Sequence, residues 1–243
     1  MDANRYQRQI NFTHFNAESQ GRLRKASVLI CGCGGLGCVL AQWLVRAGVG
    51  KIRIVDSDTV AQTNLHRQIL YTENGVGKPK LEMALAALAA MNSEVSIETV
   101  SGRLTADNAD ALAEGMDLLL DATDNYAARS LLNETSLRRN LPWIYAGVAE
   151  AQGQVLTIFP HETPCLKCLI PDLSTGLPIF ESGVLGPAVG VIGSFEAMEA
   201  IKILSGHRDA VSPFLTTFDL WNHRFSSISL AELPSCGCRK NHE

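Results

Sequence analysis

The stretch that decides the fold is "ICGCGGLGC" at residues 30–38, a glycine cluster that directly follows an apolar run. Gly32, Gly34 and Gly37 form the pattern G-x-G-x-x-G. Between a strand and a helix, glycines at this spacing permit a tight turn and let a phosphate approach backbone N–H groups at the helix N-terminus. The stretch therefore predicts a nucleotide-binding loop; the alternative is a glycine turn that serves only the packing of helix on strand.

Segments on both sides of this loop alternate between short β-branched runs and amphipathic stretches. A strand at 27–31, a helix at 36–47 and a strand at 51–55 make the first βαβ unit. The remaining predicted elements are helices at 79–91, 106–114, 126–139 and 187–204 and strands at 95–100, 117–121, 142–147, 153–159 and twice within 214–230. The pattern predicts an α/β, Rossmann-like, mostly parallel sheet with helices on both faces, extended by antiparallel strands in the C-terminal part.

The composition narrows the class of protein. Of 243 residues, 46% are apolar and 19% charged, which is typical of a globular protein. No apolar run approaches the ~18–20 residues of a membrane span, and residues 1–12 lack the apolar core of a signal peptide. A formal net charge of −4 provides no basic surface for nucleic acid. We therefore expect a cytoplasmic protein that acts on neither membranes nor nucleic acid.

Two acids follow the second predicted strand. Asp56 ends this strand, where a carboxylate can bond the ribose hydroxyls of NAD or of any unphosphorylated adenosine ribose. Asp58 lies in the same loop, and we interpret it as a solvated loop acid. These acids alone do not distinguish NAD from ATP.

The segment "QTNLHRQILYTENGVGKPK" (62–80) adds Asn64, Arg67 and Lys80. These are more phosphate-directed donors than a dinucleotide site needs at that point. Cationic side chains close to a helix N-terminus suit a triphosphate and its transition state. Ordinary surface charge is the alternative, and we prefer it for Lys78.

The stretch "DLLLDATDN" (117–125) ends a predicted buried strand with Asp121 and Asp124. Open α/β sheets bind ligands at the carboxyl edge of their strands, and one carboxylate there can hold Mg²⁺, which bridges phosphates. Capping of the next helix by Asp124 or Asn125 is an equally good interpretation. The spacing alone leaves both open.

The seven cysteines fall into two groups. Those in the glycine loop are interpreted as buried packing residues, and they are Cys31, Cys33 and Cys38. Four others could close one tetrahedral Zn²⁺ site, and they are Cys165, Cys168, Cys236 and Cys238. The alternatives are a redox CxxC, or a metal site in which His161 or His242 replaces one cysteine.

Together these residues resemble the ubiquitin-activating-enzyme superfamily in its small bacterial form, the MoeB/ThiF adenylyltransferases (HesA/MoeB/ThiF type). The matching motifs run in family order along nearly the whole chain. They are "RYQRQI" (5–10), "GCGGLG" (32–37), "AGVG" (47–50), "DSDTVAQTNLHRQ" (56–68), "VGKPK" (76–80), "DATDN" (121–125), "CLKC" (165–168) and "GVLGPAVGVIGSFEAMEAIKIL" (183–204). The resemblance implies one ThiF-type domain over 1–243, with an N-terminal arm (1–26), an ATP-binding half (27–150) and a carrier-binding and zinc half (151–243).

The family activates the C-terminal carboxylate of a ubiquitin-like sulfur carrier protein of the MoaD or ThiS type, which ends in Gly-Gly. The resemblance implies that this carboxylate attacks the α-phosphate of Mg·ATP and releases pyrophosphate. The acyl-adenylate would then receive sulfur with the help of a sulfurtransferase or cysteine desulfurase, in molybdopterin or thiamine biosynthesis. The implied cofactors are ATP, Mg²⁺ and structural Zn²⁺.

The resemblance also assigns site residues, motif by motif. Arg67 and Lys80 would act on the phosphates and Asp124 would hold Mg²⁺. Arg8 matches an arginine that family members insert into the partner subunit's ATP site, which implies a homodimer. The implied nucleotide contacts are Gly32, Gly34, Gly35, Gly37, Asp56, Thr63, Asn64, Arg67, Lys80, Asp124 and Asn125.

Two departures from the family pattern bear on the chemistry. Ile179 stands where many relatives have a cysteine, and no cysteine lies between Cys168 and Cys236. We therefore predict adenylylation without a covalent thioester or persulfide on that loop. The late family CxxC appears here as Cys236-Gly-Cys238, which alters the expected geometry of the zinc site.

Three other functions compete with this interpretation. One is a superfamily relative that adenylates a tRNA or a small molecule, since the activation chemistry is shared. Another is an NAD-dependent oxidoreductase, as the glycine pattern alone would suggest, although no acid/base constellation for hydride transfer is visible. The third is a binding module that has kept the fold without activity.

Overall fold

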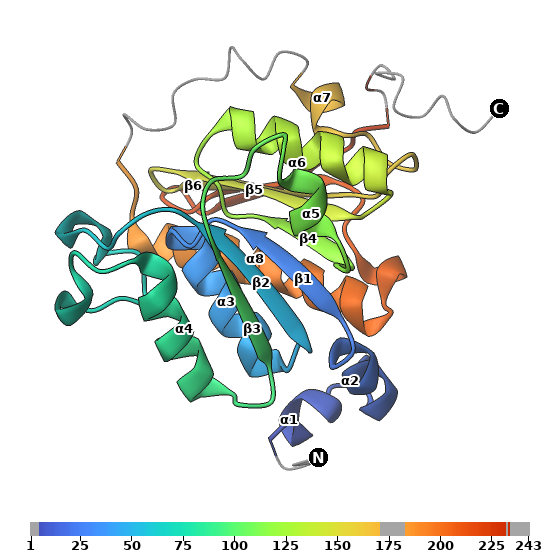
Figure 1. The fold of residues 1–243 in the computed structure, drawn as a ribbon. Coiled ribbons are helices and arrows are strands. Elements are labelled where there is room, and N and C mark those ends of the chain that lie inside the picture. Colours follow the sequence, from blue (N-terminus) through green and yellow to red (C-terminus); the bar gives the residue numbers. More distant parts are fainter. Residues whose placement is uncertain (1–4, 171–182, 232, 234–243) are drawn as a thin grey trace.

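The protein is described by a computed structural model over residues 5–170, 183–231 and 233. One eight-stranded sheet runs through it, in the order β3-β2-β1-β4-β5-β6-β7-β8, with helices on both faces (Figure 1). The strands are β1 (Ser27–Cys31), β2 (Lys51–Asp56), β3 (Ser96–Ser101), β4 (Leu118–Asp121), β5 (Trp143–Ala149), β6 (Gln152–Ile158), β7 (Leu215–Asp219) and β8 (Arg224–Ile228).

The helices divide between the two faces of the sheet. On one face α8 packs on α3 and on β5 and β6, and α4 lies beside α3; on the other, α6 packs on β4, β5, α5 and α7. The helices are α1 (Gln7–Ile10), α2 (Ala17–Leu23), α3 (Gly35–Ala47), α4 (Lys80–Met91), α5 (Ala109–Ala113), α6 (Tyr126–Arg139), α7 (Leu166–Leu169) and α8 (Gly186–Ser205). None of the helices in the described ranges is long and apolar enough to cross a membrane.

The central strands are apolar on both sides because both sides are covered. Ile30 and Leu120 belong to the core cluster under α3 and α8, whereas their neighbours Leu29 and Leu119 belong to the cluster under α6. Such two-sided burial is the reason that parallel strands form continuous apolar runs in the sequence. β1 to β5 pair in parallel and β5 to β8 pair antiparallel, which confirms the predicted fold class.

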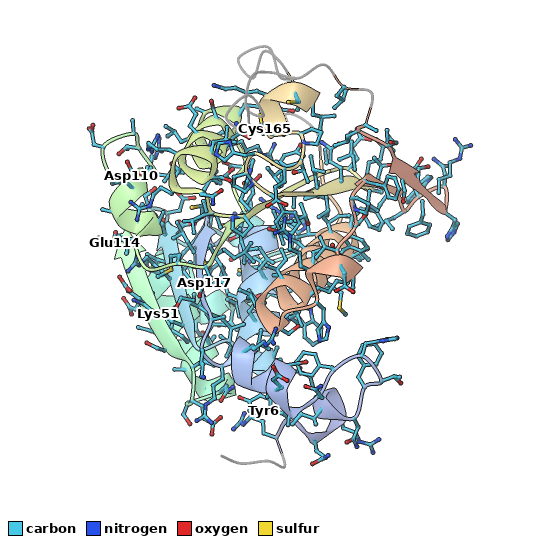
Figure 2. All side chains as sticks on the ribbon, turned by 90° about the vertical axis from the view of Figure 1, so that its right-hand side faces the viewer. Tyr6, Lys51, Asp110, Glu114, Asp117 and Cys165 are labelled. Atoms are coloured by element: carbon cyan, nitrogen blue, oxygen red, sulfur yellow. The ribbon has the colours of Figure 1, made fainter. Side chains whose placement is uncertain are left out.

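The N-terminal arm docks at the edge of the sheet opposite the glycine loop. Gly48 ends α3 in the left-handed conformation with φ of 83°, and a Cβ there would lie 2.6 Å from the Tyr6 hydroxyl. That hydroxyl accepts a hydrogen bond from Asn92 Nδ2 at 2.8 Å and donates to Glu94 Oε2 at 3.3 Å. Figure 2 shows Tyr6 at one end of the molecule and Cys165 at the other. The motif "AGVG" therefore ends α3 and leaves room for Tyr6 of the arm to pack against Gly48.

Candidate active site

A cavity of about 800 Å³ opens at the carboxyl edge of the parallel strands. It lies between the loop after β1 and the turn after β4. At this point the chain order of the strands changes direction, since β2 and β3 follow on one side of β1 and β4 and β5 on the other. Open α/β sheets bind ligands in this crevice. Eight of the predicted nucleotide contacts line it, and they are Gly32, Gly34, Gly35, Asp56, Arg67, Lys80, Asp124 and Asn125.

The glycine loop brings backbone from two strands into contact. Gly32 has φ of 102°, and a Cβ there would collide with the carbonyl of Ala122 after β4. A Cβ on Gly37 would collide with the Gly32 carbonyl, so this third glycine serves packing and does not line the cavity. Gly34 is the N-cap of α3, and no described side chain caps this helix. Its first N–H groups and the positive end of its dipole are therefore available to an anion.

Asp56 shapes the loop from the end of β2. Its Oδ2 accepts a hydrogen bond from Cys33 N and its Oδ1 accepts one from Asp58 N, each at 2.7 Å. The Tyr71 hydroxyl donates to the Cys33 carbonyl at 2.7 Å from the opposite side. The carboxylate still lines the cavity, as a ribose contact requires. Cys33 itself is fully buried, as expected for a packing residue.

The two predicted cations are held in place by neighbouring groups. Lys80 is 5% exposed, and its Nζ lies 2.8 Å from Asp58 Oδ2. Asp58 is exposed, as expected for a solvated loop acid, but it also lines the cavity and supplies the counter-charge that the buried ammonium requires. Arg67 donates from Nη1 to the Thr63 carbonyl at 2.9 Å.

The two acids at the turn after β4, Asp121 and Asp124, lie in different environments. Asp121 is fully buried and accepts from Arg129 Nε at 2.9 Å and from the Thr123 hydroxyl at 2.6 Å. Burial raises the pKa of Asp121, and the Arg129 charge opposes that shift. Arg129 also donates from Nη2 to the carbonyls of Thr123 and Ala146, each at 3.1 Å. Asp121 thus fixes the turn and is not available to a ligand.

The capping question is answered by Asn125. Its Oδ1 accepts a hydrogen bond from Ala128 N at 2.8 Å and caps α6. Asp124 is exposed on the cavity wall, where its carboxylate accepts only a 3.3 Å contact from Asn125 Nδ2 among the described residues. An exposed carboxylate in the same cavity as the uncapped end of α3 is a suitable ligand for a divalent cation.

Some predicted site residues lie outside this cavity. Asn64 Oδ1 accepts from Ala61 N at 3.0 Å and so closes the turn of η1 (Gln62–Asn64), and Thr63 is exposed beside it. Arg8 is exposed on α1, in the arm at the opposite edge of the sheet. Within one chain the arm therefore does not bring Arg8 to the glycine loop.

The candidate zinc ligands are described only in part. Cys165 and Cys168 are buried at the two ends of one turn, with their Sγ atoms 3.9 Å apart. Cys236 and Cys238 lie outside the described residues, as do His242 and Ile179. Within residues 5–170, 183–231 and 233, no group of three His, Cys, Asp or Glu side chains could hold a metal ion. The pairing of "CLKC" with "CGC" therefore stays a prediction.

Several cavity residues were missed from the sequence. Arg129 could not be identified there, because no residue near it in the sequence indicates its buried partner Asp121 on β4. Gln68 belongs to the quoted motif, but its neighbours Arg67 and Lys80 carry the stronger charge signal. The remaining missed residues on the wall include Ser57, Gly102, Arg103, Leu104, Val184 and Val189.

The groups around the cavity fit a nucleoside triphosphate with a divalent cation. The uncapped end of α3 and two cations provide donors for phosphate oxygens, and Asp124 provides a hard oxygen ligand. Glycines form one wall of the cavity, where a side chain would collide with the neighbouring backbone or with Val189. The missing side chains let a phosphate approach this backbone closely. The residues around the cavity therefore fit ATP and Mg²⁺, two of the three cofactors that the resemblance implies.

Comparison with known proteins identifies the family of this chain. The chain is 40% identical to molybdopterin-synthase adenylyltransferase of Salmonella typhimurium, over 96% of this chain and 94% of that protein. It is also 40% identical to adenylyltransferase and sulfurtransferase MOCS3 of Culex quinquefasciatus, over 93% of this chain, but it spans only about half (52%) of that relative. The crystal structure of E. coli MccB with ATP superposes with a TM-score of 0.81 at 26% identity, over 97% of this chain and 74% of that one. The model of the ThiF family matches residues 6–240, and the chain belongs to this family.

Proposed function

We propose that this protein uses ATP to adenylylate the C-terminal glycine carboxylate of a ubiquitin-like sulfur carrier protein of the MoaD or ThiS type. One observation carries the proposal. The uncapped end of α3, the cations Arg67 and Lys80 and the exposed carboxylate of Asp124 all line a single cavity. The similarity to adenylyltransferases over nearly the whole chain supports the same activity.

The reaction needs charge stabilisation more than proton transfer. A C-terminal carboxylate has a pKa of about 3.3–3.7 and is already ionised at neutral pH, so no general base is required. One carboxylate oxygen attacks the α-phosphorus, the bond from that phosphorus to the bridging oxygen breaks, and pyrophosphate leaves with the electron pair. Arg67 and Lys80 offset the repulsion between the two anions and stabilise the charge that develops on the leaving group.

Other residues would orient the nucleotide. Asp56 would hold the ribose, while the N–H groups at the start of α3 would bind phosphate oxygens. Asp124 would hold Mg²⁺, which when bound neutralises phosphate charge. Asn125 would contribute by fixing the start of α6, next to Asp124.

A second copy of the chain would complete the site. Arg8 is exposed on an arm that is anchored by Tyr6, and it is remote from the cavity of its own chain. Its proposed role is to enter the cavity of the partner subunit in a homodimer. Arg8→Ala should then be rescued in mixed dimers by a subunit that keeps Arg8 but carries an inactive cavity.

The proposed zinc site would be structural. Cys165 and Cys168 would join Cys236 and Cys238 in a thiolate set, tying α7 to the C-terminus. Metal analysis of the full chain and of Cys165→Ser would test it, because the two thiolate pairs together are expected to hold one Zn²⁺ per chain. Loss of metal in the variant supports the assignment, and an unchanged content contradicts it.

The sulfur step would use a separate donor. No cysteine lies between Cys168 and Cys236, so the chain is not expected to carry the carrier as a thioester on that loop. A sulfurtransferase or cysteine desulfurase would act on the acyl-adenylate. We place the reaction in the cytoplasm as a prediction, which cell fractionation would check.

The direct test is exchange of labelled pyrophosphate into ATP. Exchange is expected only when a carrier with an intact C-terminal Gly-Gly is present, because the reverse reaction needs the acyl-adenylate. A carrier that lacks the last glycine is the matched control. Exchange with neither a MoaD-type nor a ThiS-type carrier would overturn the proposed function.

A further inference from the structure

Gln68 occupies a fixed position against the glycine loop. Its N–H donates to the Asn64 carbonyl at 2.9 Å, and its carbonyl accepts from Tyr71 N at 3.1 Å. The Tyr71 hydroxyl in turn donates to the Cys33 carbonyl at 2.7 Å. The backbone of Gln68 is therefore tied to the loop that would hold the phosphates.

The side chain of Gln68 forms part of the cavity wall. The residue is only 4% exposed, yet it lines the cavity. Its Nε2 lies 3.8 Å from the position that a Cβ on Gly34 would occupy. Gly34 is the N-cap of α3, so the carboxamide sits beside the uncapped, positive end of that helix.

The carboxamide is incompletely satisfied by the protein. Its Oε1 is shielded from solvent and has no hydrogen-bond partner in the part of the chain that the structure describes. The nearby cations have other acceptors, because Arg67 bonds the Thr63 carbonyl and Lys80 bonds Asp58. A buried acceptor without a donor costs free energy, so the site is complete only when a ligand brings one.

The chemistry of the proposed ligand limits what that donor is. Phosphate oxygens and the carrier carboxylate only accept hydrogen bonds. Mg²⁺ keeps several of its waters when it binds phosphates, and each such water is a donor. Gln68 carries both a donor and an acceptor, whereas Arg67 and Lys80 only donate.

We propose that Gln68 is a further substrate-contacting residue, whose Nε2 donates to a phosphate oxygen and whose Oε1 accepts from a water on the divalent cation. This inference rests on the proposed function, because it takes the ligand to be a metal-bound nucleoside triphosphate. It assigns Gln68 a role that neither cation can fill. The protein would thereby favour metal-bound ATP over free ATP.

Binding of ATP without any carrier tests the assignment. We would measure dissociation constants by calorimetry for ATP with Mg²⁺ and for ATP in a chelator, with wild type, Gln68→Leu and Gln62→Leu. Gln62 is exposed in the same loop and does not line the cavity, so it is the matched control. Gln68→Leu is expected to melt at the same or a higher temperature, to bind Mg·ATP about tenfold more weakly, and to lose less affinity for free ATP.

A second variant separates the role of the donor from that of the acceptor. Gln68→Glu keeps an acceptor of the same size but loses the donor and adds a negative charge. The affinity for free ATP should therefore fall more than the affinity for Mg·ATP. Wild-type affinity in Gln68→Leu, or an equal loss for both forms of ATP, would overturn this assignment while leaving the proposed function intact. Failure of the wild type to bind either form would overturn the proposed function as well.

Discussion

The Lys80 ammonium lies 2.8 Å from a carboxylate oxygen of Asp58, although Lys80 is nearly buried and more than half of the Asp58 side chain is exposed. This contact holds the Lys80 ammonium group at the cavity wall, at the first residue of α4. Because the acid is exposed, solvent screens the pair, and it contributes little to stability. Its importance lies in where it holds the ammonium group.

Replacement of Lys80 should therefore affect catalysis more than folding. Lys80→Met is expected to slow carrier-dependent pyrophosphate exchange by ~10²-fold or more, the usual cost of removing one preorganised charge from a transition state. Lys78→Met is the control, because Lys78 is exposed two residues away and does not line the cavity. Equal rates in the two variants would contradict the assignment of Lys80.

Asp124 and Asn125 are neighbours with different expected roles. Asp124→Asn should slow exchange by on the order of 10²-fold and raise the Mg²⁺ concentration needed for half-maximal rate, because an amide is a weaker ligand for a hard cation. The melting temperature should stay near that of wild type, since Asp124 is exposed. A Mg²⁺ dependence identical to that of wild type would argue against metal binding by Asp124.

Asn125 should show a loss of stability instead. Its side chain caps α6 through a 2.8 Å bond from Ala128 N. Asn125→Ala is expected to lower the free energy of unfolding by about 1 kcal/mol. Urea denaturation of this variant beside Asp124→Asn measures the difference, and equal stability of the two would contradict the capping assignment.

The Asp121–Arg129 pair should be costly to break from either side. Both side chains are buried, and Arg129 Nε lies 2.9 Å from Asp121 Oδ2. Removal of one partner leaves an uncompensated buried charge, so Asp121→Asn and Arg129→Met are each expected to destabilise the protein by about 3–5 kcal/mol. Chemical denaturation checks this value. A loss below about 1 kcal/mol, the range of exposed pairs, would contradict the burial argument.

Glu196 on α8 predicts a dependence of stability on pH. It is fully buried, and neither carboxylate oxygen has a hydrogen-bond partner among the described residues. Burial, and then the nearby charge of Asp121, raise the pKa of Glu196 well above its usual value. In the unfolded chain this carboxyl ionises near pH 4.3, whereas in the folded protein it stays neutral up to its raised pKa. Between these two pH values, a rise in pH therefore lowers the stability of the folded protein.

The variant Glu196→Gln removes this ionisation. Between pH 5 and 8 its melting temperature should fall less than that of wild type, and it should be the more stable protein at pH 8. Calorimetry at several pH values measures both. Parallel pH curves for the two proteins would show that Glu196 is not neutral in the folded state.

The local features of this fold could be predicted from the sequence, because short segments determine them. The path from β1 through the glycine loop into α3 follows from four apolar residues, three glycines and an amphipathic run. The start of α4 and the parallel order of the sheet follow from the same alternation. Several helix and strand ends shifted, as for α5, which is shorter than the predicted 106–114. The short helices α1, α2 and α7 were not predicted.

Features that depend on distant partners could not be predicted. Nothing in the sequence near Arg129 or Glu196 indicates their burial, which arises because β4 and β5 lie under their helices. Asp58 reads as a loop acid until α4 brings Lys80 to it, 22 residues further along the chain. Gln68 is a polar residue in a loop, and only its burial against Gly34 marks it as part of the site.

Transfer of AMP to a carrier protein tests the central claim most directly. The protein would be incubated with ATP labelled at the α-phosphate and a Gly-Gly carrier, and the carrier would be analysed under mildly acidic conditions that preserve an acyl-adenylate. We predict label on the carrier's C-terminal glycine, released as AMP by hydroxylamine. Pyrophosphate release without labelled carrier, or label on a carrier whose terminal carboxylate is blocked, would contradict the account.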